Sequence, residues 1–191
     1  MTMQGSGQPL PEKLTSNEPT KLAMKIRCGY YIAGLELPTL AFVSRSIWHV
    51  GPAIMEELGV DPSNVLNIGV NKVSDDASLP LAERFTHGQL PTQEDVEGKH
   101  VLIINGSSRT GETLQHAADL MEGLGASSIK TAVVFDTGRT RSSGYSPDYR
   151  AITDGSFSNI PMPWEHNAQI QLERSFGVPP LIDVQPSLPG F

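Results

Sequence analysis

The sequence lacks most of the features that mark specialised protein classes. Its 191 residues contain a single cysteine, Cys28, which excludes an intramolecular disulfide among them and fits a reducing compartment. Because an unpaired cysteine often packs as a small apolar residue, we expect Cys28 to be packed inside the fold. With 38% hydrophobic, 18% charged and only 6% aromatic residues, the composition is that of a globular protein with a core.

Long hydrophobic runs and an excess of positive charge are also absent. No apolar run approaches the roughly 18 residues of a membrane-spanning helix, and residues 1–20 lack the apolar centre of a signal peptide. The net charge is -7 and the pI is about 5.2, whereas a protein that coats nucleic acid needs clustered lysine and arginine. We therefore expect no membrane partner, no nucleic-acid partner and a cytoplasmic location.

The sequence does contain short apolar runs that alternate with helical patterns. Runs of strand type are "TLAFVS" (39–44), "VLNIGVNKV" (65–73), "VLII" (101–104), "IKTAVVFDT" (129–137) and "YRAIT" (149–153). Helical spacing occurs at 21–32, 50–58 and 113–124, and glycines close the last two. Strand, helix and strand joined by short links form a right-handed parallel crossover. The order predicts an α/β fold with a doubly wound, mainly parallel sheet flanked by helices.

Three segments lie outside this alternation. Residues 1–20 are polar and contain glycine, proline and serine, so we expect a loose arm before a folded domain at 21–175. Residues 176–191 carry four prolines, which predicts an extended strap or a loose tail. The polar segment 74–99 has no core pattern of its own. It predicts a mobile loop over a site, with or without a short hairpin, or a solvated insertion.

The stretch "VLIINGSSRTGETL" (101–114) combines a buried strand, a loop of small residues and the start of a helix. We expect Asn105 and Gly106 to end the strand. The loop then offers hydroxyls from two serines and two threonines, with Gly111 before the helix at Thr113. Hydroxyls, close backbone approach and unpaired N–H groups at a helix start suit an anion, most often a phosphate. A tight connection without a ligand is the alternative, and the loop is neither a Walker loop nor a G-x-G-x-x-G turn.

Together with "MEGLGASSIKTAVVFDT", this stretch resembles the signature of the type I phosphoribosyltransferases. Upstream, "FVSRSIWHVGPAIMEELGV" is similar to the strand, pyrophosphate loop and helix of that family. The segments "EDVEGKHVLII" and "PMPWE" resemble its purine branch, which acts on xanthine, guanine or hypoxanthine. The resemblance covers about residues 40–165, and the T-G-x-T loop is its most specific part.

Members of that family transfer a base onto phosphoribosyl pyrophosphate with Mg²⁺ and release pyrophosphate. By this resemblance the 5′-phosphate is cradled by Ser107, Ser108, Arg109, Thr110, Gly111, Glu112 and Thr113. Pyrophosphate contacts are expected from Ser44, Arg45 and Ser46, and catalytic roles from Asn105 and Arg109. Base contacts are expected from Asp136, Phe157, Ile160 and Trp164, with the alternative that Asp136 caps a turn. The resemblance also implies a homodimer, closure of the 74–99 segment over the reacting centre, and a small hood that ends at "PMPWE" within the domain.

The chain departs from the family pattern at the reacting centre. Where the family has two adjacent acids that hold the ribose hydroxyls and the shell of the metal, this chain has Asn105 and Gly106. The acid that often precedes T-G-x-T is Arg109 here, and Asn159 replaces an aromatic residue expected to stack on the base. An amide can bond a diol but brings no charge for Mg²⁺, which prefers carboxylates.

The metal ligands and the reaction are therefore open from sequence alone. Asp75 and Asp76 either supply the missing carboxylates or form a solvated turn, and the spacing of the five histidines gives no metal cluster. The leading function is transfer of a phosphoribosyl group between pyrophosphate and a purine-type base. The alternatives are a non-catalytic protein that binds a nucleotide or phosphoribosyl pyrophosphate in regulation, and a phosphoribosyl hydrolase or a transferase with an unusual acceptor.

Overall fold

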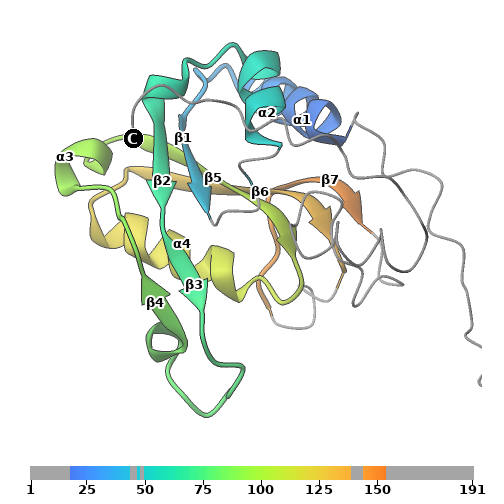
Figure 1. The fold of residues 1–191 in the computed structure, drawn as a ribbon. Helices are drawn as coiled ribbons and strands as arrows, with labels where there is room; N and C mark the ends of the chain where they lie inside the picture. Colours follow the sequence, from blue (N-terminus) through green and yellow to red (C-terminus); the bar gives the residue numbers. More distant parts are fainter. Residues whose placement is uncertain (1–17, 44–46, 48–49, 139–143, 154–191) are drawn as a thin grey trace, which may run out of the picture.

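A computed structural model describes residues 18–43, 47, 50–138 and 144–153, and these form an open parallel sheet with helices on both faces (Figure 1). The sheet has five parallel strands in the order β2-β1-β5-β6-β7. Their bounds are β1 Thr39–Val43, β2 Val65–Ile68, β5 His100–Ser108, β6 Ser128–Asp136 and β7 Tyr149–Thr153. The doubly wound, mainly parallel α/β fold expected from the sequence is confirmed.

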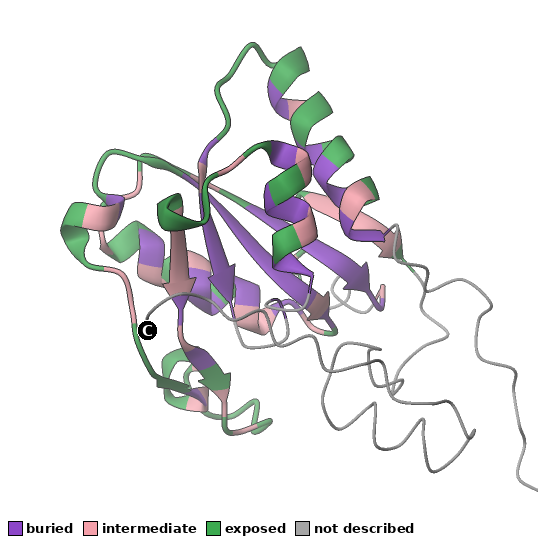
Figure 2. Cartoon of the chain, turned by 45° about the horizontal axis from the view of Figure 1, so that its top comes forward, coloured by how far each residue is buried: buried purple, intermediate pink, exposed green. Residues whose placement is uncertain are grey.

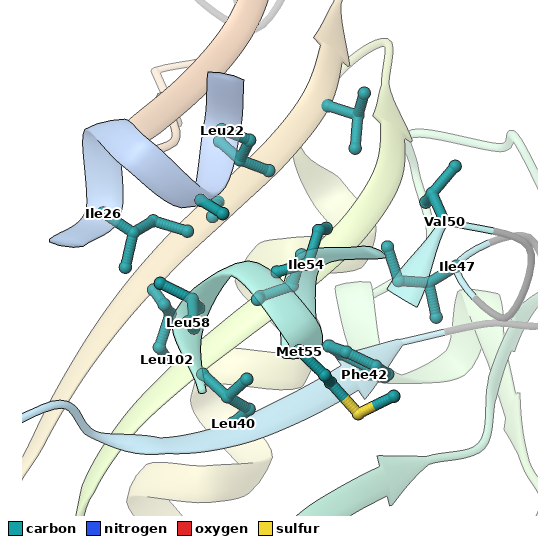
Figure 3. Packing of buried hydrophobic residues seen from close by; sticks show 14 of the residues in the cluster. Leu22, Ile26, Leu40, Phe42, Ile47, Val50, Ile54, Met55, Leu58 and Leu102 are labelled. Carbon is teal, nitrogen blue, oxygen red and sulfur yellow. The ribbon is translucent and has the colours of Figure 1, made fainter. Parts of the chain in front are cut away.

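Helices α1 (Glu18–Ile32) and α2 (Gly51–Leu58) cover one face of the sheet, and α4 (Glu112–Gly123) covers the other. The side chains of β5 alternate between the two layers, with Leu102 and Ile104 in the α1 and α2 layer and Val101 and Ile103 in the α4 layer. Because both faces are covered, the central strands carry continuous apolar runs that are buried across the centre of the molecule (Figure 2). Figure 3 shows the first layer, where side chains of α1, α2 and β1 meet.

The helix boundaries lie close to those expected. Gly59 ends α2 with a positive φ of 70°, and α4 begins at Glu112, one residue earlier than predicted. Helix α1 starts at Glu18 instead of Lys21. The expectation that Cys28 is packed is wrong, because the buried face of α1 is formed by Leu22, Ala23, Ile26 and Tyr30, and this face leaves Cys28 exposed.

The strand predicted over 65–73 is two separate strands, which is a correction. It breaks at Gly69, whose N–H donates to the Gln89 carbonyl at 2.7 Å, and a Cβ on Gly69 would lie 2.8 Å from that oxygen. After this close approach the chain leaves the parallel sheet and forms β3 (Val70–Lys72), which pairs antiparallel with β4 (Phe85–His87). The 74–99 segment thus contains β4, one strand of a short hairpin. A loop with a short hairpin was one of the forms predicted for this segment.

Three short helices complete the described elements: η2 (Pro62–Asn64) and η3 (Leu81–Arg84), which are 3₁₀ turns, and α3 (Gln93–Val96). Helix α3 opens with a capping box, in which Asp95 and Thr92 bond each other's backbone N–H groups. None of the helices in the described ranges is long and apolar enough to cross a membrane.

Strand β5 does not end at Asn105 and Gly106, as the sequence suggested, but runs to Ser108. Asn105, Ser107 and Ser108 are in register with Val133, Phe135 and Asp136 of β6, so the ladder continues through the small residues. The connection to α4 is therefore only 109–111. This short connection is held firmly, because pairing with β6 fixes the chain up to Ser108.

Several predictions fall outside the described residues. These are most of the N-terminal arm, the pyrophosphate residues Ser44, Arg45 and Ser46, the base-contact residues Phe157, Ile160 and Trp164, the hood and the C-terminal strap.

Candidate functional site

A pocket of about 360 Å³ lies where the end of β5, the start of α4 and strand β3 come together. It brings together seven of the residues predicted for the site, namely Asn105, Ser107, Ser108, Arg109, Thr110, Gly111 and Thr113. Residues 70–72 of β3 supply the rest of its lining. In open α/β sheets a ligand binds beyond the carboxyl ends of the strands, which is where this pocket lies.

Gly111 positions the backbone at the start of α4. Its φ is +80°, and a Cβ at this position would lie 2.9 Å from the ring of Tyr145, so both the conformation and the space require glycine. No side chain caps α4 at Gly111. The first N–H groups of a helix have no intrahelical acceptor and carry the positive end of the helix dipole. This end of the pocket therefore favours an anion.

The charged residues that line the pocket are both cations, Lys72 and Arg109. The nearest carboxylates lie around it and are bound to cations. Asp75 Oδ1 lies 2.5 Å from Lys72 Nζ and 3.8 Å from Arg109 Nη2. Glu112 is bound on both oxygens, with Lys72 Nζ at 2.6 Å and Arg84 Nη1 at 2.7 Å.

These ion pairs favour the charged form of each partner. The hydrogen bond from Lys72 lowers the pKa of Glu112 more than burial raises it, and the bond from Arg84 adds to this effect. Burial alone would lower the pKa of Lys72, but its bonds to Asp75 and Glu112 outweigh burial and raise that pKa. Glu112 and Lys72 are therefore both ionised near neutral pH, and the pocket keeps its positive lining.

The resemblance to the family implies a bound Mg²⁺, but the described residues of the pocket do not fit this ion. Asn105 is buried and its side-chain oxygen accepts the Gly106 N–H at 2.8 Å, while Gly106 offers no side chain. Asp75 and Glu112 already bind cations, so a metal would have to displace Lys72 or Arg84. In the part of the chain that the structure describes, no three histidine, cysteine or acidic residues are grouped to hold a metal.

Asp136, for which a base contact was expected, ends β6 and is fully buried. One carboxylate oxygen lies 3.1 Å from Arg150 Nη1, and the other accepts the Gly138 N–H at 2.9 Å. The bond to Gly138 is a turn cap, which was the alternative role expected for Asp136 from the sequence. A contact with a base stays a prediction.

A second contact joins the hairpin of β3 and β4 to α4, and no sequence motif indicates it. The Nε2 atoms of His87 on β4 and His116 on α4 lie 2.8 Å apart, and Phe85 stacks on His116 with ring centroids 4.5 Å apart. Together with Glu112, which binds Lys72 and Arg84, this pair fixes the hairpin against α4 beside the pocket. No local signal identifies these partners, because they lie on different elements.

The histidine pair predicts that the protein loses stability in mild acid. Burial, together with neighbouring His87, lowers the pKa of His116 below its ordinary value of 6.5. The unfolded chain therefore takes up a proton at a higher pH than the folded chain. This contribution to stability is complete well above pH 6.5 and is lost as the pH falls through that value towards the lower folded pKa. We expect a lower midpoint of thermal unfolding at about pH 5.5 than at about pH 7.5.

The variant His116→Gln should flatten this pH dependence, because glutamine does not titrate in that range. The matched control is His100→Gln, since His100 lies exposed at the start of β5 and bonds Ser128. An unchanged pH profile in His116→Gln would show that other groups cause the loss of stability.

Comparison with known proteins agrees with the fold. The family model of the phosphoribosyl transferase domain matches residues 54–169, which is more than half of the chain. No curated protein matches the sequence. Among solved structures, the chain is similar to a purine phosphoribosyltransferase from Pyrococcus horikoshii, with 24% identity and a TM-score of 0.53, over 72% of this chain and 80% of that one.

Two similar structures are of hypoxanthine phosphoribosyltransferase from Trypanosoma cruzi. One is a mutant in a ternary complex with substrates, with 22% identity and a TM-score of 0.55, over 72% of this chain and 75% of that one. The other is a complex with the product IMP, with 20% identity and a TM-score of 0.51, over 72% and 70%. These likenesses agree on the fold, and the family match covers both β5 and α4. The chain belongs to the phosphoribosyl transferase domain family.

Proposed function

We propose that this protein binds a phosphoribosyl ligand by its 5′-phosphate and transfers the phosphoribosyl group between pyrophosphate and a purine-type base. The observation that carries the proposal is the pocket at the start of α4, in which hydroxyls and backbone N–H groups meet a lining whose charged members are cations. A phosphorylated sugar supplies both the anion and the polar groups that such a lining selects.

The 5′-phosphate is proposed to lie against the 109–111 connection. Thr110 and Thr113 line the pocket on either side of Gly111, so their hydroxyls lie close to the helix start. Gly111 lets the backbone approach the phosphate, because it has no side chain. The positive end of α4 and the guanidinium of Arg109 add charge stabilisation.

Phosphoribosyl transfer needs positioning and charge stabilisation more than covalent help from the protein. In this proposal Asn105 orients the ribose hydroxyls, and Lys72 and Arg109 stabilise the negative charge that develops on the leaving pyrophosphate. The predicted pyrophosphate contacts of Ser44, Arg45 and Ser46 and the predicted base contacts of Asp136, Phe157, Ile160 and Trp164 belong to the same proposal. The purine-type base is supported by the purine and hypoxanthine enzymes among the similar structures.

A second candidate function is binding without turnover. It is favoured by the ionic state of the pocket, where no carboxylate lines the described wall and Arg109 occupies the position at which family members often carry an acid. Without a free carboxylate the described wall offers no general base for the incoming purine nitrogen. The same pocket would then sequester or sense a nucleotide or phosphoribosyl pyrophosphate.

Calorimetry and product analysis on the purified protein test the proposal. Ribose 5-phosphate, phosphoribosyl pyrophosphate and IMP are titrated, and phosphoribosyl pyrophosphate is then incubated with hypoxanthine, guanine, xanthine and adenine. Nucleotide and pyrophosphate formation supports transfer, and binding without product supports the second candidate. Breakdown of IMP without a base acceptor indicates a hydrolase. If none of the three ligands binds, the proposed function is wrong.

We also propose that the protein forms a homodimer, as the family resemblance implies. Light scattering coupled to size-exclusion chromatography measures the mass in solution. A mass of twice 20.6 kDa supports the proposal, and a mass of 20.6 kDa contradicts it.

A further inference from the structure

We propose that Asp75 occupies the place of a second anionic group of the ligand, which Lys72 and Arg109 bind directly and without a divalent metal. The inference rests on the proposed function and deepens it, because it names a ligand with two phosphorylated ends. It starts from one atom, Asp75 Oδ1, which contacts Lys72 Nζ at 2.5 Å and approaches Arg109 Nη2 at 3.8 Å. A phosphate oxygen between two cations makes the same kind of contact.

Asp75 is free to leave this position. Its side chain is 76% exposed, and an exposed ion pair contributes little free energy, so a ligand anion can replace it at small cost. Arg109 is half exposed and lines the pocket, so it can turn towards the ligand. The carboxylate of Asp75 therefore acts as a displaceable counter-ion at the mouth of the pocket.

Lys72, in contrast, is held in place when Asp75 leaves. Its ammonium remains bound to Glu112 Oε2 at 2.6 Å, and the other oxygen of Glu112 binds Arg84. Arg84 is largely buried, and its Nε has no hydrogen-bond partner among the residues that the structure describes. Two cations, Lys72 and Arg84, then share the one carboxylate of Glu112, and Arg109 is left without its partner Asp75. The surplus positive charge lies beside the pocket and attracts a polyanion.

This arrangement makes a metal unnecessary for binding. The pyrophosphate group of a phosphoribosyl donor carries several negative charges, and a divalent cation commonly neutralises some of them before the donor reaches a protein carboxylate. Here the described wall of the pocket presents Lys72 and Arg109 and no carboxylate, so the donor is recognised best as the free anion.

Calorimetry with two ligands separates the second anionic group from the first. Phosphoribosyl pyrophosphate and ribose 5-phosphate share the 5′-phosphate, and only the former has the pyrophosphate group. Both are titrated in EDTA and again in excess Mg²⁺. In EDTA we expect phosphoribosyl pyrophosphate to bind about tenfold or more tightly than ribose 5-phosphate, and Mg²⁺ should not tighten it further.

Variants at the proposed contacts test the assignment to Lys72 and Asp75. Lys72→Met should remove the advantage of phosphoribosyl pyrophosphate while ribose 5-phosphate still binds. Asp75→Asn should tighten phosphoribosyl pyrophosphate by roughly threefold, because the competing carboxylate is gone. The matched control is Asp76→Asn, which makes the same change of charge at a side chain that bonds Ser78, and asparagine can keep that bond. The control should leave both affinities unchanged.

The outcomes distinguish this inference from the proposed function. If ribose 5-phosphate binds but phosphoribosyl pyrophosphate binds no better in EDTA, or gains affinity only with Mg²⁺, the inference is overturned and the proposed function stands. An equal effect of Asp75→Asn and Asp76→Asn also overturns it, because net charge would then explain the change. If neither ligand binds under any condition, the proposed function itself fails. Since Asp75→Asn alters an exposed residue, it remains informative even if Lys72→Met does not fold.

Discussion

The double variant Thr110→Val with Thr113→Val is expected to bind ribose 5-phosphate at least about 100-fold more weakly than the wild-type protein, since a hydrogen bond to a charged group contributes roughly 1.5–3 kcal/mol. Valine keeps the shape of threonine and replaces its hydroxyl with a methyl group. Both residues line the pocket on either side of Gly111, so the substitution removes two donors from the proposed phosphate position. Isothermal titration with ribose 5-phosphate measures the loss.

The control for this prediction is Thr39→Val, which makes the same chemical change at the first residue of β1, the opposite end of the sheet from the pocket. It should bind ribose 5-phosphate as the wild type does. Circular dichroism of the double variant and of Thr39→Val verifies that both are folded. Undiminished affinity in the folded double variant would mean that the 5′-phosphate does not bind at the start of α4.

Arg150→Met is expected to destabilise the protein by about 3 kcal/mol, because it takes the guanidinium away from a buried carboxylate. Asp136 is 0% exposed and lies 3.1 Å from Arg150 Nη1, so its charge has little access to water. Arg150 also donates to Ser146 and to the Pro147 carbonyl, which ties the approach to β7 to the end of β6. Urea unfolding at neutral pH measures the difference in the free energy of unfolding.

An exposed ion pair provides the comparison. Lys130 pairs with Asp148 at 2.8 Å, with 52% and 33% of the two side chains exposed, so Lys130→Met should cost at most about 1 kcal/mol. Adding Asp136→Asn to Arg150→Met should recover part of the lost stability, because the amide carries no charge and can still accept the Gly138 N–H. Equal losses of stability in Lys130→Met and Arg150→Met would show that the burial of Asp136 does not govern the loss.

The local patterns in the sequence predicted most of the elements, because each depends on neighbouring residues. The continuous apolar runs of β1, β5 and β6 are typical of strands covered on both faces, and the structure has helices on both faces. Two errors in the strand bounds occurred where a distant contact competes with the local pattern. Gly69 breaks a predicted strand because its backbone bonds Gln89, and β5 continues past Gly106 because β6 extends alongside it.

The cationic character of the pocket was not predictable in the same way. The loop "SSRTGET" indicates an anion by its hydroxyls and glycine, and the pocket forms around most of those residues. Glu112 was expected to contribute to the phosphate cradle, whereas its carboxylate binds Lys72 and Arg84 of the hairpin. Its contact with a phosphate stays a prediction. No motif marks Lys72, and only its place at the end of a short strand could have drawn attention to it.

The sequence by itself determined the α/β class, the order along the chain of the five strands of the main sheet and helices α1, α2 and α4, and a hydroxyl-rich loop at the start of a helix. These follow from periodicity and residue type within short windows. The tertiary structure alone decided the charge around that loop, since Lys72 and Glu112 are 40 residues apart and Arg84 and Glu112 are 28 apart. It also decided the His87 and His116 contact, across 29 residues. Such pairs depend on how the hairpin folds back against α4, and that path is set by packing and not by any local pattern.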